Sequence, residues 1–279
     1  MSPTAKSLIL DLLSTLRRGT MPVQALVEAG QLFGIAENST RVALTRLTAA
    51  GTAERDARGS YRLSEEPGPV GRRATSWRRL ERGLRRWSGD WIGVMAPLTG
   101  RGERARREHA LGLLGFAPLA PGLSVRPDNL PLRIDAIRAE LLDLGLAPGD
   151  LVLSLRDLDA VTDARARRAW NGDEIRSEHR AMLARIEQSS RELRDQPVER
   201  AMVESFLLGG QAIRQLILDP QLPDELVSGD ERRALLDAMR DYDALGRHAW
   251  APFLERFSVP HLRAPADTRM IAGASRLGR

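Results

Sequence analysis

The chain has 279 residues, of which 42% are apolar and 28% charged, a balance typical of a folded globular protein. No run of about 18 uncharged apolar residues is present, and Asp11 interrupts the apolar N-terminal stretch, so we expect neither a membrane span nor a secretion signal. The lack of cysteine excludes disulfides and thiolate chemistry, and the expected compartment is the cytoplasm.

The net charge of +5 is distributed unevenly along the chain. Residues 1–90 contain 15 Lys and Arg against 9 Asp and Glu, whereas residues 91–279 contain 27 against 28. The positive surplus therefore lies in the N-terminal third, where it would attract the phosphates of a nucleic acid. Lys6 is the only lysine, a bias that we attribute to genomic base composition and that does not explain where the surplus lies.

Residues 4–65 predict a winged helix-turn-helix. The expected elements are a helix with the leucine stripe Leu8, Leu12, Leu13 and Leu16, a helix over Val23–Phe33 that Pro22 can begin, a helix over Ser39–Ala50, and two short strands around the turn Asp56–Gly59. The third helix would be the recognition helix, and the two strands would form the wing.

The third helix is two-faced when its residues are placed about 100° apart. Ala43, Leu44, Leu47 and Ala50 share the side that should face a core. The other side offers cations, an amide, a hydroxyl and a methyl group, which suit a major groove. The residues expected to contact DNA are Asn38, Ser39, Thr40, Arg41, Val42, Thr45 and Arg46 on the helix, with Arg58 and Arg62 on the wing. Two alternatives are open: Asn38 can cap the helix, and the wing arginines can be solvated.

Residues 65–71 form a linker with two prolines and two glycines, and residues 72–87 predict a basic helix. Its apolar stripe is Trp77, Leu80, Leu84 and Trp87, and seven arginines cover the rest. Either Arg72, Arg73, Arg78 and Arg79 contact phosphates, or this face is solvated on a spacer helix.

The expected fold class is α+β with several domains. Residues 91–156 alternate as βα(ββ)αβ, the order of a ferredoxin-like domain, with strands at 91–98, within 116–125 and at 151–158 and helices at 101–114 and 129–144. Helices are expected near 163–194, 197–218 and 230–257, and the tail 264–279 lacks periodicity. The expected domains are the winged helix (1–66), a basic linker helix (67–88), the ferredoxin-like domain (89–160) and a helical C-terminal domain (161–279).

The sequence gives no support for catalysis. The four histidines are scattered without metal-ligand spacing, and neither a Gly-x-Ser-x-Gly motif nor a phosphate-binding glycine loop is present. Asp90 beside the first central strand invites a metal assignment, but one carboxylate without partners cannot hold Mg²⁺, and a turn position explains it. We therefore expect no catalytic residue, no metal, no cofactor and no enzyme activity.

Several patches in order make the chain resemble the PaaX family of bacterial transcriptional regulators. They are Thr40–Leu47 with Ala50-Gly51, Ser60–Leu63, Trp87–Trp91 as a Trp-x-Gly-x-Trp motif, Leu113–Phe116 with Pro121–Pro127, and Leu218–Pro223 as an Asp-Pro-x-Leu-Pro signature. Where relatives usually carry Trp-Pro-Gly after that signature, this chain has Ser228-Gly229-Asp230. Tyr242 stands where an aromatic residue is expected.

The resemblance implies a central domain similar to the CRISPR protein Cas2 and a homodimer that binds an inverted-repeat operator on double-stranded DNA. It also implies repression of a catabolic operon, such as one for phenylacetate, and release by an aryl-CoA or acyl-CoA thioester such as phenylacetyl-CoA. The effector-binding residues are unassigned. The clusters Arg104, Arg106 and Arg107 and Arg165, Arg167 and Arg168 can bind phosphates or pair with their acidic neighbours. The alternative functions are a Cas2-like metal-dependent nuclease and a protein–protein scaffold.

Overall fold

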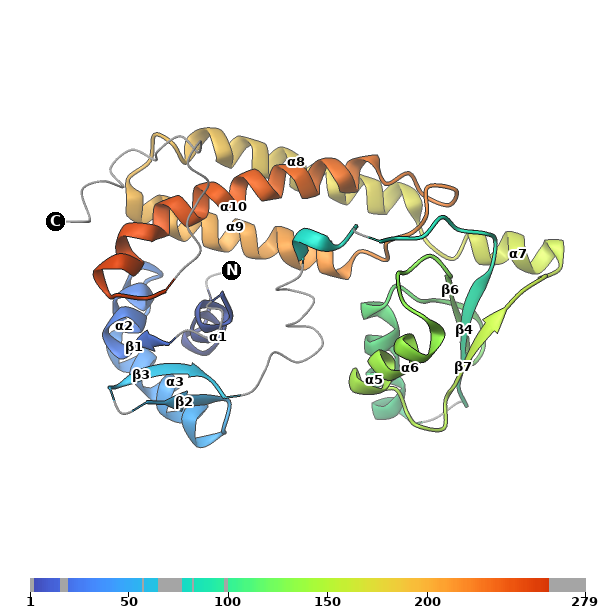
Figure 1. Cartoon of the computed structure of the whole chain (residues 1–279), viewed down its shortest axis with the longest axis horizontal. Helices are drawn as coiled ribbons and strands as arrows, with labels where there is room; N and C mark the ends of the chain where they lie inside the picture. The colour runs from blue at the N-terminus through green and yellow to red at the C-terminus, as the bar shows by residue number, and fades with distance from the viewer. Residues whose placement is uncertain are drawn as a thin grey trace. The chain divides into compact units, whose positions relative to one another are not determined.

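The protein is an α+β structure with two antiparallel sheets (Figure 1). This computed structural model describes residues 3–15, 20–56, 58–64, 77–81, 83–97 and 100–260. The chain divides into two compact units. The first contains Met1–Thr75, Ala184–Ala212 and Ala238–Arg279, and the second contains Ser76–Leu183 and Ile213–Asp237.

The first unit begins with helices and a small sheet. Its elements are α1 (Ala5–Thr15), β1 (Met21–Pro22), α2 (Val23–Leu32), α3 (Glu37–Ala49), β2 (Ala53–Arg55) and β3 (Ser60–Leu63). The sheet has the order β1-β3-β2 with antiparallel neighbours. Leu8, Leu12 and Leu13 are buried as their helical spacing predicts, together with Leu44 and Leu47 of α3. Leu16, the last member of the expected stripe, lies outside the described residues.

The C-terminal helices supply the rest of the first unit. They are α8 (Gly172–Glu192), α9 (Val198–Leu218) and α10 (Asp230–Arg256), of which this unit takes the parts given above. The Trp250 indole nitrogen donates to the Met202 carbonyl at 3.0 Å, which ties α10 to α9. Phe33, just after α2, meets Phe206 of α9 edge-on at 5.4 Å. The N-terminal helices therefore share a core with the C-terminal ones.

The second unit contains a four-stranded antiparallel sheet. Its elements are β4 (Trp91–Met95), α5 (Arg101–Leu113), β5 (Ala117–Ala120), β6 (Leu123–Pro127), α6 (Ile134–Asp143), β7 (Leu151–Leu155) and α7 (Ala160–Arg167). The strand order is β5-β6-β4-β7. The helices α5 and α6 cover one face of the sheet, where Ile92, Val94, Leu114 and Ile137 lie in one buried cluster (Figure 1).

Tryptophans fill the opposite face of this sheet. Trp91 packs edge-on against Trp87 at 5.0 Å and stacks on Trp170 at 6.2 Å. Its indole nitrogen donates to Asp163 of α7 at 3.1 Å. Trp91 thus combines a large buried area with a satisfied polar atom and acts as a packing anchor on this face.

The helix predicted over residues 72–87 is wrong where the structure describes it. Only Trp77–Arg79 form a helical turn, of the 3-10 type (η1), and the described residues that follow are irregular. Gly83 has a φ of +85°, which an α-helix does not allow. The Trp87 indole donates to the Asp90 carbonyl at 2.6 Å, and the Arg85 amide donates to the Asn129 carbonyl at 2.7 Å. Tertiary packing therefore overrides the local amphipathic pattern.

Two other helices differ from their predicted bounds. The helix expected from Asn129 begins at Ile134, because Asn129 is buried and its side chain is used in long-range hydrogen bonds described below. The helix expected over 163–194 is split into α7 and α8. Asn171 starts the second of these, since its side-chain oxygen accepts from the Glu174 amide at 3.2 Å.

Candidate nucleic-acid interface

The outer face of α3 carries a group of exposed polar side chains. Asn38, Ser39, Arg41, Thr45 and Arg46 are all exposed. Val42 lies among them and is 39% exposed, although its side chain is apolar. An exposed methyl-bearing residue beside cations is compatible with a surface that contacts base edges.

The start and end of α3 are set by backbone groups. The residue before the helix is Ala36, whose side chain accepts no hydrogen bond, so the alternative that Asn38 caps the helix is wrong. The helix ends where Gly51 takes a φ of +68° and the Thr52 amide donates to the Leu47 carbonyl at 2.9 Å. Asn38 therefore lies in the first turn of α3 and does not cap the helix.

Arg41 and Arg46 differ in their local partners. The Arg41 guanidinium pairs with Glu37 at 2.8 Å, and both side chains are about half exposed. Such an exposed pair contributes about 0–1 kcal/mol, so a stronger partner can displace Glu37. Arg46 has no ion-pair partner within the part of the chain that the structure describes. The Thr45 hydroxyl donates to the Arg41 carbonyl at 3.0 Å, which fixes the orientation of its methyl group.

Thr40 must be removed from the set expected to contact DNA. It is only 1% exposed, and it faces α2. A Cβ atom added to Gly30 would lie 2.7 Å from the Thr40 hydroxyl oxygen, so the two helices approach closely at this point. Thr40 shares the inner face of α3 with Leu44 and Leu47, four and seven residues later.

The turn between β2 and β3, where the sequence predicts a wing, is held by Asp56. Asp56 accepts hydrogen bonds from the amides of Arg58 at 3.0 Å and Ser60 at 2.8 Å, and Gly59 turns the chain with a φ of +80°. Arg58 at this turn is exposed. Arg62 on β3 pairs with Glu54 on β2 at 2.8 Å in a solvent-exposed position. The β2–β3 hairpin therefore presents Arg58 with an exposed side chain and Arg62 with a weak partner.

Some of the other cationic candidates contact neighbouring side chains. Arg72 and Arg73 lie outside the described residues, as does the side chain of Arg79, while the Arg78 guanidinium lies 4.7 Å from the centre of the Trp77 ring. In the two clusters considered for a CoA ligand, the salt-bridge alternative is confirmed at three positions. These pairs are Arg104–Glu108 at 2.8 Å, Arg107–Asp150 at 2.8 Å and Arg167–Asp163 at 2.5 Å.

Asp90 does not form part of a metal-binding group. Its carboxylate lies 3.5 Å from the Arg156 guanidinium, beside the start of β4. Among the residues described, no group of three or more His, Cys, Asp and Glu side chains could hold a metal ion. Over the same residues, no helix is both long and apolar enough to cross a bilayer.

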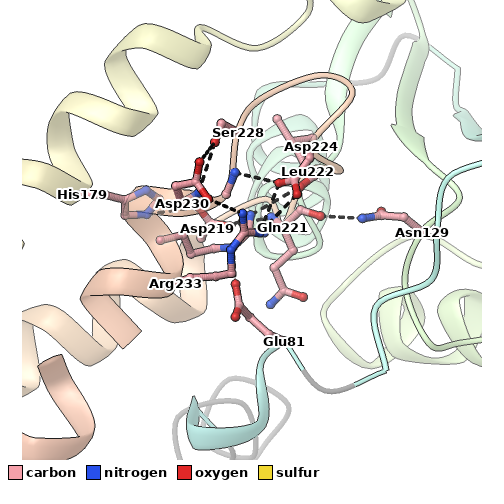
Figure 2. Close-up of polar contacts among 12 residues, drawn as sticks. Glu81, Asn129, His179, Asp219, Gln221, Leu222, Asp224, Ser228, Asp230 and Arg233 are labelled. Carbon is pink, nitrogen blue, oxygen red and sulfur yellow. Dashed lines mark hydrogen bonds and ion pairs between the residues drawn. The ribbon is translucent and has the colours of Figure 1, made fainter. Parts of the chain in front are cut away.

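A second polar cluster surrounds Asp219 in the second unit, and sequence reasoning did not assign it a role (Figure 2). Asp219 is 6% exposed and lies 3.1 Å from His179 Nε2 and 3.2 Å from Arg232. It also accepts from the Gln221 amide at 2.6 Å. Burial alone would raise the pKa of Asp219, but the hydrogen bond from His179 and the charge of Arg232 outweigh it and hold the pKa below its usual value.

The cluster around Asp219 extends to the four-stranded sheet. The Asn129 amide donates to the Gln221 carbonyl at 2.7 Å, a contact visible in Figure 2, and the buried Arg126 donates to Asn129 at 3.0 Å. Arg232 also pairs with Glu81 at 3.2 Å. Each charged group has partners of opposite charge or complementary polarity, so this arrangement stabilises the junction of α9 and α10 with the sheet.

The segment that departs from the family pattern has its own local structure. Ser228 and Asp230 are joined by a hydrogen bond from the serine hydroxyl to the carboxylate at 2.8 Å, and the Gly229 amide donates to Asp224 at 2.8 Å (Figure 2). These hydrogen bonds hold the segment at the start of α10, where the expected tryptophan is missing. Tyr242, the aromatic residue expected in that helix, is 1% exposed.

Comparisons with known proteins agree with this layout. Residues 4–67 match a family model described as PaaX-like protein, and residues 170–251 match one described as PaaX-like protein C-terminal domain. The structure is similar to the uncharacterized protein Rv0674 from Mycobacterium tuberculosis, with 26% identity, a TM-score of 0.59, and coverage of 88% of this chain and 98% of that chain. No curated protein matches the chain. Since the two family models together cover just over half of its residues, the chain belongs to the PaaX-like family.

Proposed function

We propose that this protein is a sequence-specific DNA-binding transcriptional regulator whose residues 1–66 form a winged helix-turn-helix. The observation that carries this proposal is the division of α3 into two faces. Leu44 and Leu47 are buried, whereas Arg41, Val42, Thr45 and Arg46 are exposed together on the opposite side. An α-helix with this surface fits the major groove, which admits one helix.

The exposed side chains of α3 suit direct contact with base edges. A guanidinium can donate twice to the O6 and N7 atoms of guanine, which assigns this role to Arg41 and Arg46. The Asn38 amide suits adenine, and Ser39 lies close enough to the helix start to reach a phosphate. Because the Thr45 hydroxyl already donates to the Arg41 carbonyl, we assign to Thr45 and Val42 contacts with thymine methyl groups.

Contacts with phosphates are assigned to arginines outside α3. Arg58 at the tip of the wing and Arg62 near its base follow the recognition helix along the duplex. We also propose that the segment after the wing contacts phosphates through Arg72, Arg73, Arg78 and Arg79. Cations at these positions release counterions from DNA without reading sequence.

The other proposed features are those that the resemblance to the PaaX family implies. The strand order β5-β6-β4-β7 supports a ferredoxin-like, Cas2-like domain over 89–160, with a linker at 67–88 and a helical domain over 161–279. We propose a cytoplasmic homodimer on an inverted-repeat operator that represses a catabolic operon. The effector suggested by the resemblance is an aryl-CoA or acyl-CoA thioester such as phenylacetyl-CoA.

The test is a binding titration of the full chain on its own promoter and on random duplex, at several salt concentrations. We expect tighter binding to the promoter, and Arg41→Ala should weaken promoter binding by about 1–3 kcal/mol while relaxing the preference for one base pair. Arg106→Ala is the control, because Arg106 is an exposed arginine on α5. Equal affinity for both duplexes at moderate salt would refute the proposal.

A further inference from the structure

A groove runs along the facing sides of α8 and α9 in the first unit. It encloses about 700 Å³, and its lining comes from the two helices and from Leu32, the last residue of α2. On α8 the lining residues Arg185, Ser189 and Glu192 recur at helical spacing, so one face of that helix forms one wall. The groove therefore adjoins the helix that supports α3.

Ser189, in the lining of the groove, is hydrogen-bonded to Tyr242 and Glu204. Ser189 and Tyr242 are both buried, and their hydroxyl oxygens lie 2.8 Å apart. The Ser189 hydroxyl donates to the Glu204 carboxylate at 2.5 Å. Since a serine hydroxyl has one hydrogen, Tyr242 must be the donor to Ser189. Burial raises the pKa of Tyr242 above its usual value, so its phenol stays protonated and keeps this role.

Glu204 receives only neutral donors. One carboxylate oxygen accepts from Ser189, and the other accepts from the Gln196 amide at 3.1 Å. Over the described part of the chain, Glu204 has no ion-pair partner. A carboxylate offers about four acceptor positions, so further donors can still bind. The hydrogen-bonded chain thus holds a negative charge in a fixed orientation at the groove wall.

The charges of the lining favour a cation over an anion. The carboxylates are Glu192, Glu199 and Glu204, against the guanidiniums of Arg185 and Arg200. Arg185 already donates to the Gln211 side-chain oxygen at 2.8 Å. A multiply phosphorylated ligand would meet this surplus of carboxylates, and like charges in a partly enclosed site repel strongly.

The lining also contains aliphatic side chains. Val203, Leu207 and Leu208 lie on the same face of α9 as Glu204, and Leu32 closes the groove from α2. A short apolar body can lie against these aliphatic side chains beside the Glu204 carboxylate, which combines apolar contact with one polar anchor.

We propose that this groove binds a small organic cation, namely a primary amine with a short apolar body. Its ammonium group donates to Glu204, and its apolar body lies against Leu32, Val203 and Leu207. This goes beyond the proposed DNA-binding function and names a ligand class other than the acyl-CoA thioester. Because Leu32 ends α2 and α2 packs on α3, a ligand with different affinities for two positions of α2 would change the affinity for DNA.

The test is a calorimetric or NMR titration of the full chain with two sets of probes. Within each set the apolar group is constant and the charge of the polar group differs. The sets are benzylamine, benzyl alcohol and benzoate, and hexylamine, hexanol and hexanoate. We expect an amine to bind at least about tenfold more tightly than its alcohol and its acid. Glu204→Gln should weaken amine binding by about tenfold or more, while Glu187→Gln, at an exposed position of α8 outside the groove, should leave it unchanged.

A second variant protects the test against misfolding of the first. Leu207→Trp should fill the groove and prevent amine binding while leaving Glu204 in place. The proposal is overturned if alcohols or acids bind as tightly as amines, or if amine affinity is the same in wild type, Glu204→Gln and Leu207→Trp. Promoter affinity measured without amine separates the two proposals. If the groove does not bind amines, tight promoter binding is still expected. Promoter binding is lost only if the DNA-binding proposal is wrong.

Discussion

The outer face of α3 and the cluster around Asp219 use charge in opposite ways. On α3, Arg41 is 53% exposed and its partner Glu37 is 50% exposed, so the pair contributes little and can be exchanged. Around Asp219, the side chains of Asp219, His179 and Arg232 are all less than a tenth exposed. Charges with exchangeable partners are available to a ligand, whereas charges with buried partners are committed to the fold. Exposure therefore separates a binding surface from an architectural cluster more reliably than the number of charges does.

The largest expected effect is loss of stability when Asp219 is removed. Asp219→Ala leaves the buried His179 without its carboxylate and Arg232 with Glu81 as its remaining ion-pair partner among the described residues, and a broken buried pair costs about 3–5 kcal/mol. The measurement is urea unfolding of the full chain. Asp173→Ala is the matched control, because Asp173 pairs with Arg176 at 2.6 Å while its side chain is 90% exposed, and we expect a change below about 0.5 kcal/mol. Similar losses in the two variants would contradict the comparison.

The same cluster predicts a loss of stability in acid. The folded pKa of Asp219 is lowered, so the unfolded chain takes up this proton first as the pH falls. The stabilisation is fully present above the ordinary pKa of 3.8 and is lost as the pH falls from there through the lowered folded pKa. Unfolding midpoints of wild type and Asp219→Asn should therefore converge below about pH 4. Parallel curves would show that another carboxylate controls the acid transition.

A medium effect is expected where α2 meets α3. In Gly30→Ala the new methyl group would lie 2.7 Å from the Thr40 hydroxyl oxygen, and overpacking of this kind costs about 1–3 kcal/mol. That oxygen has no hydrogen-bond partner among the described residues, so Thr40→Ala removes the clash without breaking a bond. The double variant should recover most of the stability in a thermodynamic cycle. Additive losses would show that the close approach is not the cause.

Local patterns explain which parts of the fold could be predicted. The leucine spacing of α1 and the two faces of α3 recur within a few residues, so periodicity located them. The signal for Thr40 was also present, because it lies four residues before Leu44 and seven before Leu47, but its polar side chain suggested an outward position. The segment 72–87 had an equally good pattern, yet Gly83 and the packing of Trp87 prevent a helix there.

Long-range contacts explain what could not be predicted. Arg232 reaches Glu81 across 151 residues, and Asn129 reaches Gln221 across 92. No sequence spacing indicates such pairs, although the Asp-Pro-x-Leu-Pro signature marked the segment on which they converge. The groove between α8 and α9 was missed for the same reason, because Glu204, Ser189 and Tyr242 come from three helices.

The smallest expected effect is at the tip of the wing. Arg58 is exposed, and its backbone amide donates to Asp56 at 3.0 Å, while its side chain has no hydrogen bond or ion pair within the described part of the chain. If its side chain contacts a phosphate, Arg58→Ala weakens binding to promoter and random duplex by the same factor and reduces the salt dependence by about one unit of slope. Arg41→Ala, in contrast, should change the preference between the two duplexes. The measurement is a salt titration of both variants on both duplexes. A change of base preference in Arg58→Ala would show that Arg58 contacts bases in a groove. Arg58 would then belong with the exposed arginines that read sequence and not with those that only neutralise phosphates.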